Sequence, residues 1–328
     1  MNLVTGANGF VGNNLVRSLL AQGDAVRCMV REKSNLRSLE GLPVETVTGD
    51  VTNRQSLMAA FDGVDTVYHL AAVIAIAPGR EELMEQVNVL GTDNVIEACL
   101  EKGIRRLCHV SSSHALHEPG GNTVVDEGQP FDDEQRMVYG RTKARASCHV
   151  LASCQRGLDA VIACPTGMIG PNDFRPSESG QSVIDYANAR VRTYIPGGYT
   201  FVDVRDVADA LIGLAEKGRS GEYYLLAGQR ITMRELVEII GDITGQDRLA
   251  LGVPAGVIGP LATLMTGWAR LTKTRTIITT DVVETLRANP VFDATKARNE
   301  LGFSPRPLHQ CLEETLAWFR AHGPTHMA

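Results

Sequence analysis

The sequence predicts a doubly wound α/β domain, built on a parallel sheet, with a smaller and mostly helical second lobe. Short apolar runs alternate with helical patterns through the first half of the chain. These runs are continuously apolar, which is typical of strands covered by helices on both faces. A chain of 328 residues is also long for one compact core, so a second lobe and a cleft are expected.

The strands and helices of the first half follow from this pattern. The expected strands are residues 1–5, 25–31, 44–48, 64–70, 105–111 and 158–164. The expected helices are residues 11–22, 53–61, 81–102 and 136–156. Strands and helices that alternate in this way form a Rossmann-type sheet.

After residue 170 the alternation stops in a segment rich in Pro, Ser and Gly, and it resumes with "YTFVDVRDVADALIGLAEKG" and "GEYYLLAG". Residues beyond 229 are mostly helical in pattern. We therefore predict a nucleotide-binding sheet domain from 1–170 plus 200–228. The substrate-binding lobe would comprise 171–199 plus 229–328.

The composition is that of an ordinary soluble protein. A net charge of −6 leaves no basic excess for a phosphate backbone, which argues against nucleic acid as a partner. Seven cysteines, with no C-x-x-C, predict reduced thiols and a cytoplasmic location. The N-terminus shows no charged region or cleavage site of an export signal.

Three glycines, spaced three apart, fall between the first strand and the first helix. There the helix N–H groups point outward, and a missing Cβ lets a pyrophosphate approach. The alternative is a tight turn that needs glycine at positive φ. The predicted phosphate-binding loop comprises Gly6, Asn8, Gly9, Phe10, Val11 and Gly12.

Two further segments would follow the same dinucleotide across the sheet edge. Asp50 comes after the third strand, where it could bind the adenine amine, and Val51 could pack on the ring. Leu70, Ala71 and Ala72 follow the fourth strand and are small enough to let a cofactor pass.

The end of the second strand decides which dinucleotide is bound. Arg31 stands there, helped by Lys33 or Ser34, and charge-assisted hydrogen bonds to a 2′-phosphate would favour NADP(H). In the alternative, Glu32 binds the ribose hydroxyls and the cofactor is NAD(H).

Tyr139 and Lys143 are spaced i, i+4 on a predicted helix and therefore project from one face. An ammonium about 4 Å from a phenol is worth up to roughly 4 kcal/mol at an effective dielectric constant of about 20, or about three pK units. We therefore expect Lys143 to lower the pKa of Tyr139. A serine from "HVSSSH" would hydrogen-bond the reacting oxygen.

The motifs "TGANGFVG", "GDVT", "HLAA", "VSSS", "YGRTK" and "CPTGMIGP" together resemble the extended short-chain dehydrogenase/reductases of the NAD-dependent epimerase/dehydratase superfamily. The chain is most similar to dihydroflavonol-reductase-like and 3β-hydroxysteroid-dehydrogenase-like members. This resemblance covers nearly the whole chain and implies an NAD(P)-dependent oxidoreductase. It makes Tyr139 the acid/base, Lys143 its partner and a cofactor ligand, and Asn88 a helix residue near the site.

The resemblance also suggests the remaining site residues. Alignment from the strand makes Ser112 catalytic, whereas counting back from Leu116 would choose Ser113; we take Ser112. His114 or His117 could reach the substrate, and no metal site is predicted because no third ligand is indicated. The last predicted cofactor ligands are Pro165, Thr166 and Gly167.

The favoured function is hydride transfer between NADP(H) and a carbonyl or secondary alcohol of a small lipophilic or polycyclic substrate. One alternative is an NAD-dependent nucleotide-sugar epimerase or dehydratase, for which Arg175, Arg190 and Arg192 could bind a diphosphate. Another is a non-catalytic NADP-binding sensor or scaffold, which the intact Ser, Tyr and Lys set argues against.

Residues 249–269 carry no charge and are followed by Arg270, Lys273 and Arg275. Pro254 and Pro260 argue against a membrane span. We expect a cleft wall or homodimer interface; peripheral membrane contact through 249–275 is the alternative. The residues expected to be buried are Val257, Ile258, Leu261, Leu264, Met265 and Trp268.

Replacement of Arg31 tests the choice of cofactor. Arg31→Ala should weaken NADPH far more than NADH, because a charge-assisted contact to phosphate is worth about 1.5–3 kcal/mol. Titration of the variant with each cofactor measures this. Equal losses for the two would remove the 2′-phosphate assignment and favour Glu32.

Overall fold

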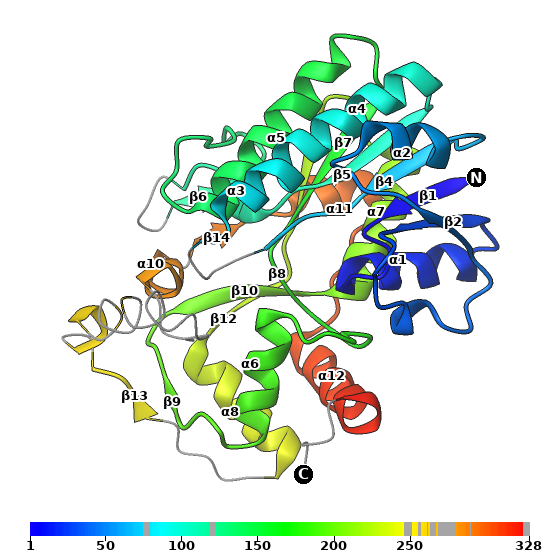
Figure 1. The fold of residues 1–328 in the computed structure, drawn as a ribbon. Coiled ribbons are helices and arrows are strands. Elements are labelled where there is room, and N and C mark those ends of the chain that lie inside the picture. The colour runs from blue at the N-terminus through cyan, green and yellow to red at the C-terminus, as the bar shows by residue number, and fades with distance from the viewer. Residues whose placement is uncertain are drawn as a thin grey trace.

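The computed structural model describes residues 1–74, 79–118, 123–245, 251–254, 257–260, 262, 267, 280–288 and 290–323. Its centre is a seven-stranded sheet in the order β11-β7-β5-β4-β1-β2-β3, with helices on both faces (Figure 1). Every pair of neighbouring strands in this sheet is parallel. The predicted Rossmann-type fold class is therefore confirmed.

The strands of the large sheet begin and end within two residues of their predicted bounds. They are β1 (Asn2–Thr5), β2 (Val26–Val30), β3 (Glu45–Thr48), β4 (Thr66–His69), β5 (Arg106–Val110), β7 (Ala160–Pro165) and β11 (Tyr223–Leu226). The chain proceeds outward from β1 to β3 and then crosses back to β4, on the other side of β1. Open parallel sheets generally bind ligands at the carboxyl ends of the strands where the order reverses in this way, here β1 and β4.

Two layers of helices cover the sheet. One face packs against α1 (Phe10–Ala21), η1 (Arg37–Leu39) and α7 (Val204–Lys217), and the other packs against α2 (Arg54–Ala60), α4 (Gly91–Lys102) and α5 (Val138–Cys154). The helix predicted at 81–102 is present but interrupted. It consists of α3 (Glu81–Met84), a π-helical segment (Glu85–Leu90) and α4.

A second, smaller sheet lies below the first in Figure 1. Its strands are β8 (Gly167–Ile169), β10 (Gly198–Asp203) and β12 (Gln229–Thr232), and β10 is parallel to β8 but antiparallel to β12. Helices α6 (Glu178–Ala187), α8 (Met233–Thr244) and α12 (Leu308–His322) share one apolar core with it. Short elements complete the lobe and its borders: η3 (Ser113–Ala115), β6 (Val124–Val125), β9 (Thr193–Tyr194), β13 (Leu251–Gly252), α10 (Thr280–Ala288), β14 (Val291–Phe292) and α11 (Thr295–Leu301).

Part of the chain assigned by sequence to the second lobe packs on the first. In α11 and the turn after it, Ala297, Leu301 and Phe303 lie in the same apolar core as α7. Strand β14 pairs with β6, beside the large sheet. Residues 291–303 pack on the first lobe because their apolar side chains complete the core on the face of the large sheet that α7 covers. The other predicted domain boundaries stay predictions.

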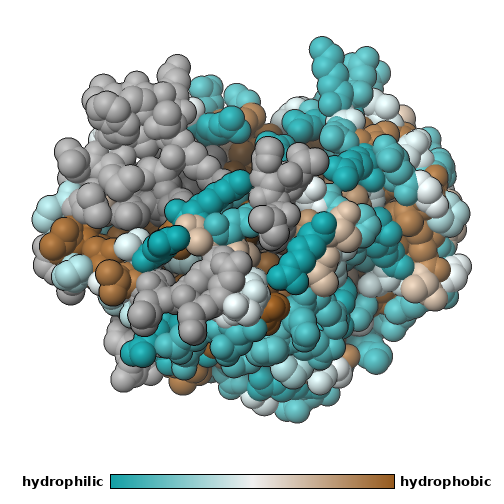
Figure 2. All heavy atoms as spheres, turned by 90° about the horizontal axis from the view of Figure 1, so that it is seen from below, coloured by the Kyte–Doolittle hydropathy of each residue, from teal (hydrophilic) through white to brown (hydrophobic). Residues whose placement is uncertain are grey.

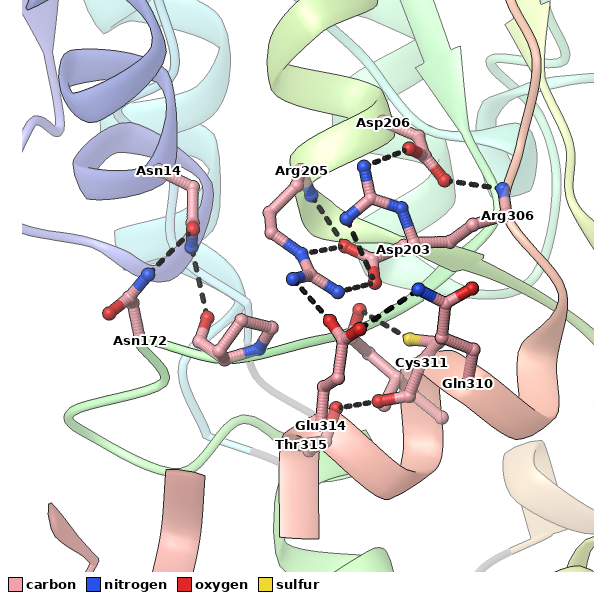
Figure 3. Close-up of polar contacts among 12 residues, drawn as sticks. Asn14, Asn172, Asp203, Arg205, Asp206, Arg306, Gln310, Cys311, Glu314 and Thr315 are labelled. Carbon is pink, nitrogen blue, oxygen red and sulfur yellow. Dashed lines mark hydrogen bonds and ion pairs between the residues drawn. The ribbon is translucent and has the colours of Figure 1, made fainter. Parts of the chain in front are cut away.

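A buried ionic cluster joins the lobes (Figure 3). Asp203 ends β10 and caps α7, and its carboxylate accepts hydrogen bonds from Arg205 N, Nε and Nη2 at 2.6–2.9 Å. Arg205 also pairs with Glu314 of α12, while Arg306 pairs with Asp206. Burial alone would raise the pKa of Asp203, but the Arg205 hydrogen bonds hold it below its usual value. The carboxylate thereby fixes β10, α7 and α12 together.

The apolar segment from 249 is only partly described. Ile258, which was expected to be buried, packs with Ala262 beside Val283 and Leu286 of α10. The same expectation is wrong for Val257, which is exposed. Leu261, Leu264, Met265, Trp268 and residues 270–275 lie outside the described residues, so peripheral membrane contact and homodimerisation stay predictions. No helix in the described part of the chain is long and apolar enough to cross a bilayer.

The lower face of the molecule is mostly hydrophilic (Figure 2). Apolar atoms gather at the side where β9 and β13 lie, and Leu251 and Val257 are exposed large apolar residues.

All seven cysteines are free, as expected of reduced thiols.

Candidate active site

In the glycine turn between β1 and α1, packing requires glycine at positions 6 and 12, whereas position 9 leaves room for a ligand. Gly6 has φ +68°, and a Cβ there would lie 2.9 Å from Ala71 N; a Cβ on Gly12 would lie 2.2 Å from Gly6 O. Gly9 differs, because its Cβ would meet only Gly6 O, at 3.1 Å. Gly9 is exposed and begins α1, which has no side-chain cap and no acidic residue in its first turn. The first-turn N–H groups of α1 are thus suited to a phosphate.

A hydrogen-bond network holds residues 70–72 beside this turn. Thr5 Oγ1 accepts from Leu70 N and Ala71 N, both at 3.1 Å, and lies 2.9 Å from His69 Nδ1. Because Thr5 Oγ1 already accepts from two amides, its own proton is donated to His69 Nδ1. We therefore assign the His69 proton to Nε2, which donates to Thr92 Oγ1. Burial lowers the pKa of His69 to about 3. His69 is therefore a neutral structural link.

The loop after β2 lies against the same turn. Asn8 Nδ2 donates to Asn35 O at 3.1 Å, and Ser38 Oγ donates to Asn8 O at 3.1 Å. Arg31 and Glu32, at the start of this loop, are both exposed. The choice between NADP and NAD therefore stays a prediction.

The side chains of the segment after β3 have partners within the protein that the sequence did not indicate. Asp50 Oδ1 accepts hydrogen bonds from Thr52 N and Oγ1 at 2.9 and 2.8 Å. Val51 is buried, and a Cβ on Gly91 would lie 2.8 Å from its Cγ2. Val51 thus has a packing role against α4, in addition to its predicted contact with adenine.

The predicted catalytic residues meet at the carboxyl end of β5. Ser112 precedes η3, and Tyr139 and Lys143 lie one turn apart in α5. Lys143 is buried, and its Nζ donates to Val110 O at 2.6 Å. Ser112 lies close enough to Tyr139 to act against the rise of its pKa. Ser111 instead accepts a hydrogen bond from Ser147 within α5.

Burial shifts the pKa values of these two groups in opposite directions. The pKa of Tyr139 rises to about 12, because desolvation outweighs the hydrogen bond from Ser112. The pKa of the Lys143 ammonium falls to about 8 for the same reason. The expectation that the pKa of Tyr139 lies below its usual value is therefore wrong, because burial dominates both groups and Lys143 Nζ is held at a backbone carbonyl.

Asn88 connects the sheet edge to the catalytic helix. It lies in the π-helical segment, a form often found at functional sites. Its Oδ1 accepts from Val73 N at 2.8 Å, and its Nδ2 donates to Val73 O and to Thr142 Oγ1. Thr142 Oγ1 in turn donates to the carbonyl oxygen of Tyr139. Asn88 therefore helps to position Tyr139.

The segment after β7 contains an unsatisfied hydroxyl. Pro165 ends the strand, and Thr166 Oγ1 is buried without a hydrogen-bond partner among the described residues. A polar group of a bound ligand would satisfy it. Position 167 requires glycine for packing, since a Cβ there would lie 2.2 Å from Tyr199 Cε1. An open helix terminus and this hydroxyl together fit a dinucleotide that crosses the sheet edge.

A small pocket of about 10 Å³ lies between the two lobes, and its lining includes Ser113, the residue after Ser112. His114 Nε2 is 2.7 Å from Tyr199 Oη, and burial lowers the pKa of His114 to about 4. His117, the other candidate, is half exposed and pairs with Asp132. None of the lining residues that the structure describes is Lys or Arg. They are Ser113, His114, Glu118, Thr166, Tyr199, Thr200, Thr285, Pro290 and Phe292.

Sequence reasoning missed the far wall of this pocket. Tyr199 and Thr200 come from β10, Thr285 from α10 and Phe292 from β14. No motif or periodicity marks them, because they come together only when the second lobe packs on the first. The three arginines suggested for a diphosphate, Arg175, Arg190 and Arg192, are not among the described lining residues.

Comparison with known proteins gives consistent matches over the whole chain. Residues 2–227 match the NAD dependent epimerase/dehydratase family. Sterol demethylase protein B of Methylococcus capsulatus is 35% identical over 98% of both chains. The 3 beta-hydroxysteroid dehydrogenase/Delta 5→4-isomerase of Mycobacterium tuberculosis is 30% identical over 97% of this chain and 90% of its own length. The crystal structure of gox2253 superposes with a TM-score of 0.87 at 32% identity over 98% of both chains.

Two alanine variants separate the roles of the glycines. Gly9→Ala should keep the free energy of unfolding within about 1 kcal/mol of the wild type but weaken NADPH binding by about tenfold or more, because the methyl group obstructs the approach to α1. Gly12→Ala should lose about 1–3 kcal/mol of stability, since its Cβ clashes with a carbonyl oxygen. Denaturation curves and cofactor titrations measure both effects. Wild-type affinity in Gly9→Ala would reduce the turn to a purely conformational role.

Proposed function

The chain belongs to the NAD dependent epimerase/dehydratase family, and on that premise we propose that it reduces the carbonyl group of a neutral, sterol-like substrate with NADPH, or oxidises the matching secondary alcohol. The protein is a nicotinamide-dependent oxidoreductase of the short-chain dehydrogenase/reductase type. The observation that carries the proposal is the arrangement of Ser112, Tyr139 and Lys143 beside a pocket without cationic residues in its described lining.

When bound, the nicotinamide supplies or accepts the hydride. For reduction, Tyr139 Oη donates its proton to the carbonyl oxygen of the substrate, while Ser112 Oγ donates a hydrogen bond to that oxygen. The Lys143 ammonium then stabilises the negative charge left on Tyr139. A pKa of about 12 keeps Tyr139 protonated at neutral pH, as a proton donor must be.

The choice of NADP rests on Arg31. It is exposed at the end of β2, and it forms no salt bridge with any residue that the structure describes. A free guanidinium beside the glycine turn suits a 2′-phosphate. Glu32, the ligand that NAD would need, is the next residue along and is the alternative.

The character of the pocket supports a neutral substrate. Pro290 and Phe292 supply apolar surface, and Glu118 is the acidic residue in the described lining. A nucleotide sugar carries a diphosphate that would need cationic partners. The similarity to sterol demethylase protein B agrees with a polycyclic substrate.

Absorbance of NADPH tests this proposal directly. The purified protein should oxidise NADPH with 5α-cholestan-3-one and leave UDP-glucose unchanged. Tyr139→Phe should lower kcat by about 10²–10⁴-fold, because only the proton donor is lost, and should bind NADPH nearly as well as the wild type. Lys143→Met should damage both turnover and binding.

The alternatives predict different results in the same assay. Epimerisation of UDP-glucose with tightly retained NAD would favour the nucleotide-sugar enzyme. NADPH binding without turnover of any ketone would favour a sensor or scaffold. More than about a tenth of wild-type kcat in Tyr139→Phe would contradict its acid role.

The rate of ketone reduction should depend on the Lys143 proton. Its pKa is lowered from 10.5 to about 8, so Lys143 is charged below pH 8 and neutral above it. Since the charge stabilises the deprotonated Tyr139, kcat should fall by about tenfold per pH unit above 8. Tyr139, with a pKa of about 12, adds no loss in this range. The residual activity of Lys143→Met should lack this decline, and a wild-type rate that stays constant to pH 10 would contradict the role of Lys143.

A further inference from the structure

Asn8, in the middle of the glycine turn, is held by the loop that follows β2. Its Nδ2 donates to Asn35 O at 3.1 Å, and its carbonyl oxygen accepts from Ser38 Oγ at 3.1 Å. Ser38 is buried, and its own carbonyl oxygen accepts from Arg17 Nη2 of α1 at 3.1 Å. The loop at 35–38 thus fixes the backbone of the glycine turn from one side.

Arg37 connects this loop to the last turn of α12. Its backbone N donates to Asn35 Oδ1 at 2.9 Å, and its Nη2 donates to His322 O at 3.2 Å. The last carbonyl oxygens of a helix have no partner within the helix, and a cation beside them is favourable. The guanidinium also lies over the ring of Phe174, with Cζ 5.8 Å from the centroid. Arg37 therefore joins the β2 loop to the second lobe at two points.

Aromatic rings continue the contact from Phe174 into α12. The rings of Phe174 and Trp318 meet edge to face, with centroids 5.1 Å apart and planes at 76°. Trp318 stacks in turn on the imidazole of His322, at 5.3 Å and 18°. Such ring pairs contribute more than the apolar area that they bury. Arg37 thus contacts both ends of a row of three rings.

The segment after β8 leads back to the beginning of α1. Asn14 Nδ2 donates to Pro171 O at 3.2 Å, and Asn172 Nδ2 donates to Asn14 Oδ1 at 3.0 Å (Figure 3). Asn13 Nδ2 donates to Asn172 O at 3.1 Å and also to Gly9 O, in the glycine turn, at 2.8 Å. Asn172 has φ +64°, a conformation that asparagine adopts more readily than most residues. The second lobe is therefore bonded to the glycine turn from this side as well.

These contacts form a closed ring around the beginning of α1. The ring leaves the glycine turn through the β2 loop, reaches the last turn of α12, and returns through Phe174 and residues 171–172. The bond from Arg37 to His322 spans 285 residues of the sequence, so no local motif indicates it. Backbone N–H groups bind a phosphate well only when their positions are fixed in advance. The contacts that fix the turn therefore affect its affinity for a dinucleotide.

We propose that a clasp between the β2 loop and α12 positions the glycine turn for the diphosphate of the dinucleotide. The clasp consists of Arg37, Phe174, Trp318 and His322. The diphosphate is common to NADP and NAD, so the clasp supports both cofactors equally, whereas Arg31 would select between them. By linkage, a bound dinucleotide in turn stabilises the last turn of α12. The inference requires only the nicotinamide cofactor of the family and is independent of the substrate proposed above.

Titration of purified variants with NADPH and with NADH tests the clasp. Arg37→Ala and Trp318→Leu should each weaken both cofactors by the same factor, about three- to tenfold, as expected for the loss of one cation–π contact or hydrogen bond. The double variant should lose little more than either single variant, because both substitutions break the same connection. Trp318→Phe keeps a ring edge on Phe174 and should bind like the wild type. Arg320→Ala is the matched control, since Arg320 is exposed in the same turn of α12 and outside the clasp.

Hydrogen exchange separates positioning of the glycine turn from simple packing of the lobes. Either cofactor should slow amide exchange severalfold in the last turn of α12, residues 318–322, of the wild type. The same cofactor should have little effect there in Arg37→Ala. A clasp that only packs the lobes together would change the free energy of unfolding without this response.

Three results would overturn the clasp. Wild-type affinity for both cofactors in Arg37→Ala and Trp318→Leu would reduce it to a packing contact. Loss of affinity for NADPH alone in Arg37→Ala would make Arg37 a direct ligand of the 2′-phosphate instead. Exchange in α12 that does not respond to either cofactor in the wild type would remove the coupling. Phe174→Leu interrupts the same connection if Trp318→Leu folds poorly. Because these measurements use cofactor binding alone, failure of ketone reduction would leave their outcome unaffected.

Discussion

The arrangement of the site depends on one buried carboxylate. Asp203 has no exposed side-chain surface, and a charge in that position is tolerated only with partners. Asp203 pairs with Arg205 and, at longer range, with Arg306. Arg205 also pairs with Glu314 of α12 (Figure 3). Because Asp203 also ends β10 and begins α7, this cluster fixes the small sheet to a helix that packs on α1. Tyr199 and Thr200, earlier in β10, take their places in the pocket from this connection.

Desolvation then sets the chemistry at the centre of the site. The same burial raises the pKa of Tyr139 and lowers that of Lys143, so both groups are biased towards their neutral forms. His69 and His114 are kept neutral by the same effect. These imidazoles are therefore hydrogen-bonding links rather than charges: one joins the glycine turn to α4, and the other joins Ser112 to the second lobe.

Local patterns predicted the large sheet and the placement of Ser112, Tyr139 and Lys143 well, and long-range packing accounts for the differences. The helix expected at 81–102 contains a π-helical segment in which Asn88 bonds to Val73 and to Thr142. Residues 291–303 return to the first core because their apolar side chains complete it. The pKa of Tyr139 differs from its expected value because the burial of Tyr139 and Lys143 outweighs the effect of one neighbouring charge.

The sequence by itself determined the doubly wound fold, the glycine turn and the i, i+4 pair of Tyr139 and Lys143. Each of these is a local pattern, in which strand continuity, helix periodicity or the absence of a Cβ acts over a few neighbouring residues. Only the tertiary structure decided which residues of the second lobe, such as Tyr199 and Phe292, line one pocket with Ser113, and which way the pKa values shift. Those properties depend on burial and on contacts between distant segments, because solvent exclusion is a property of the packed molecule and not of any short stretch of the chain.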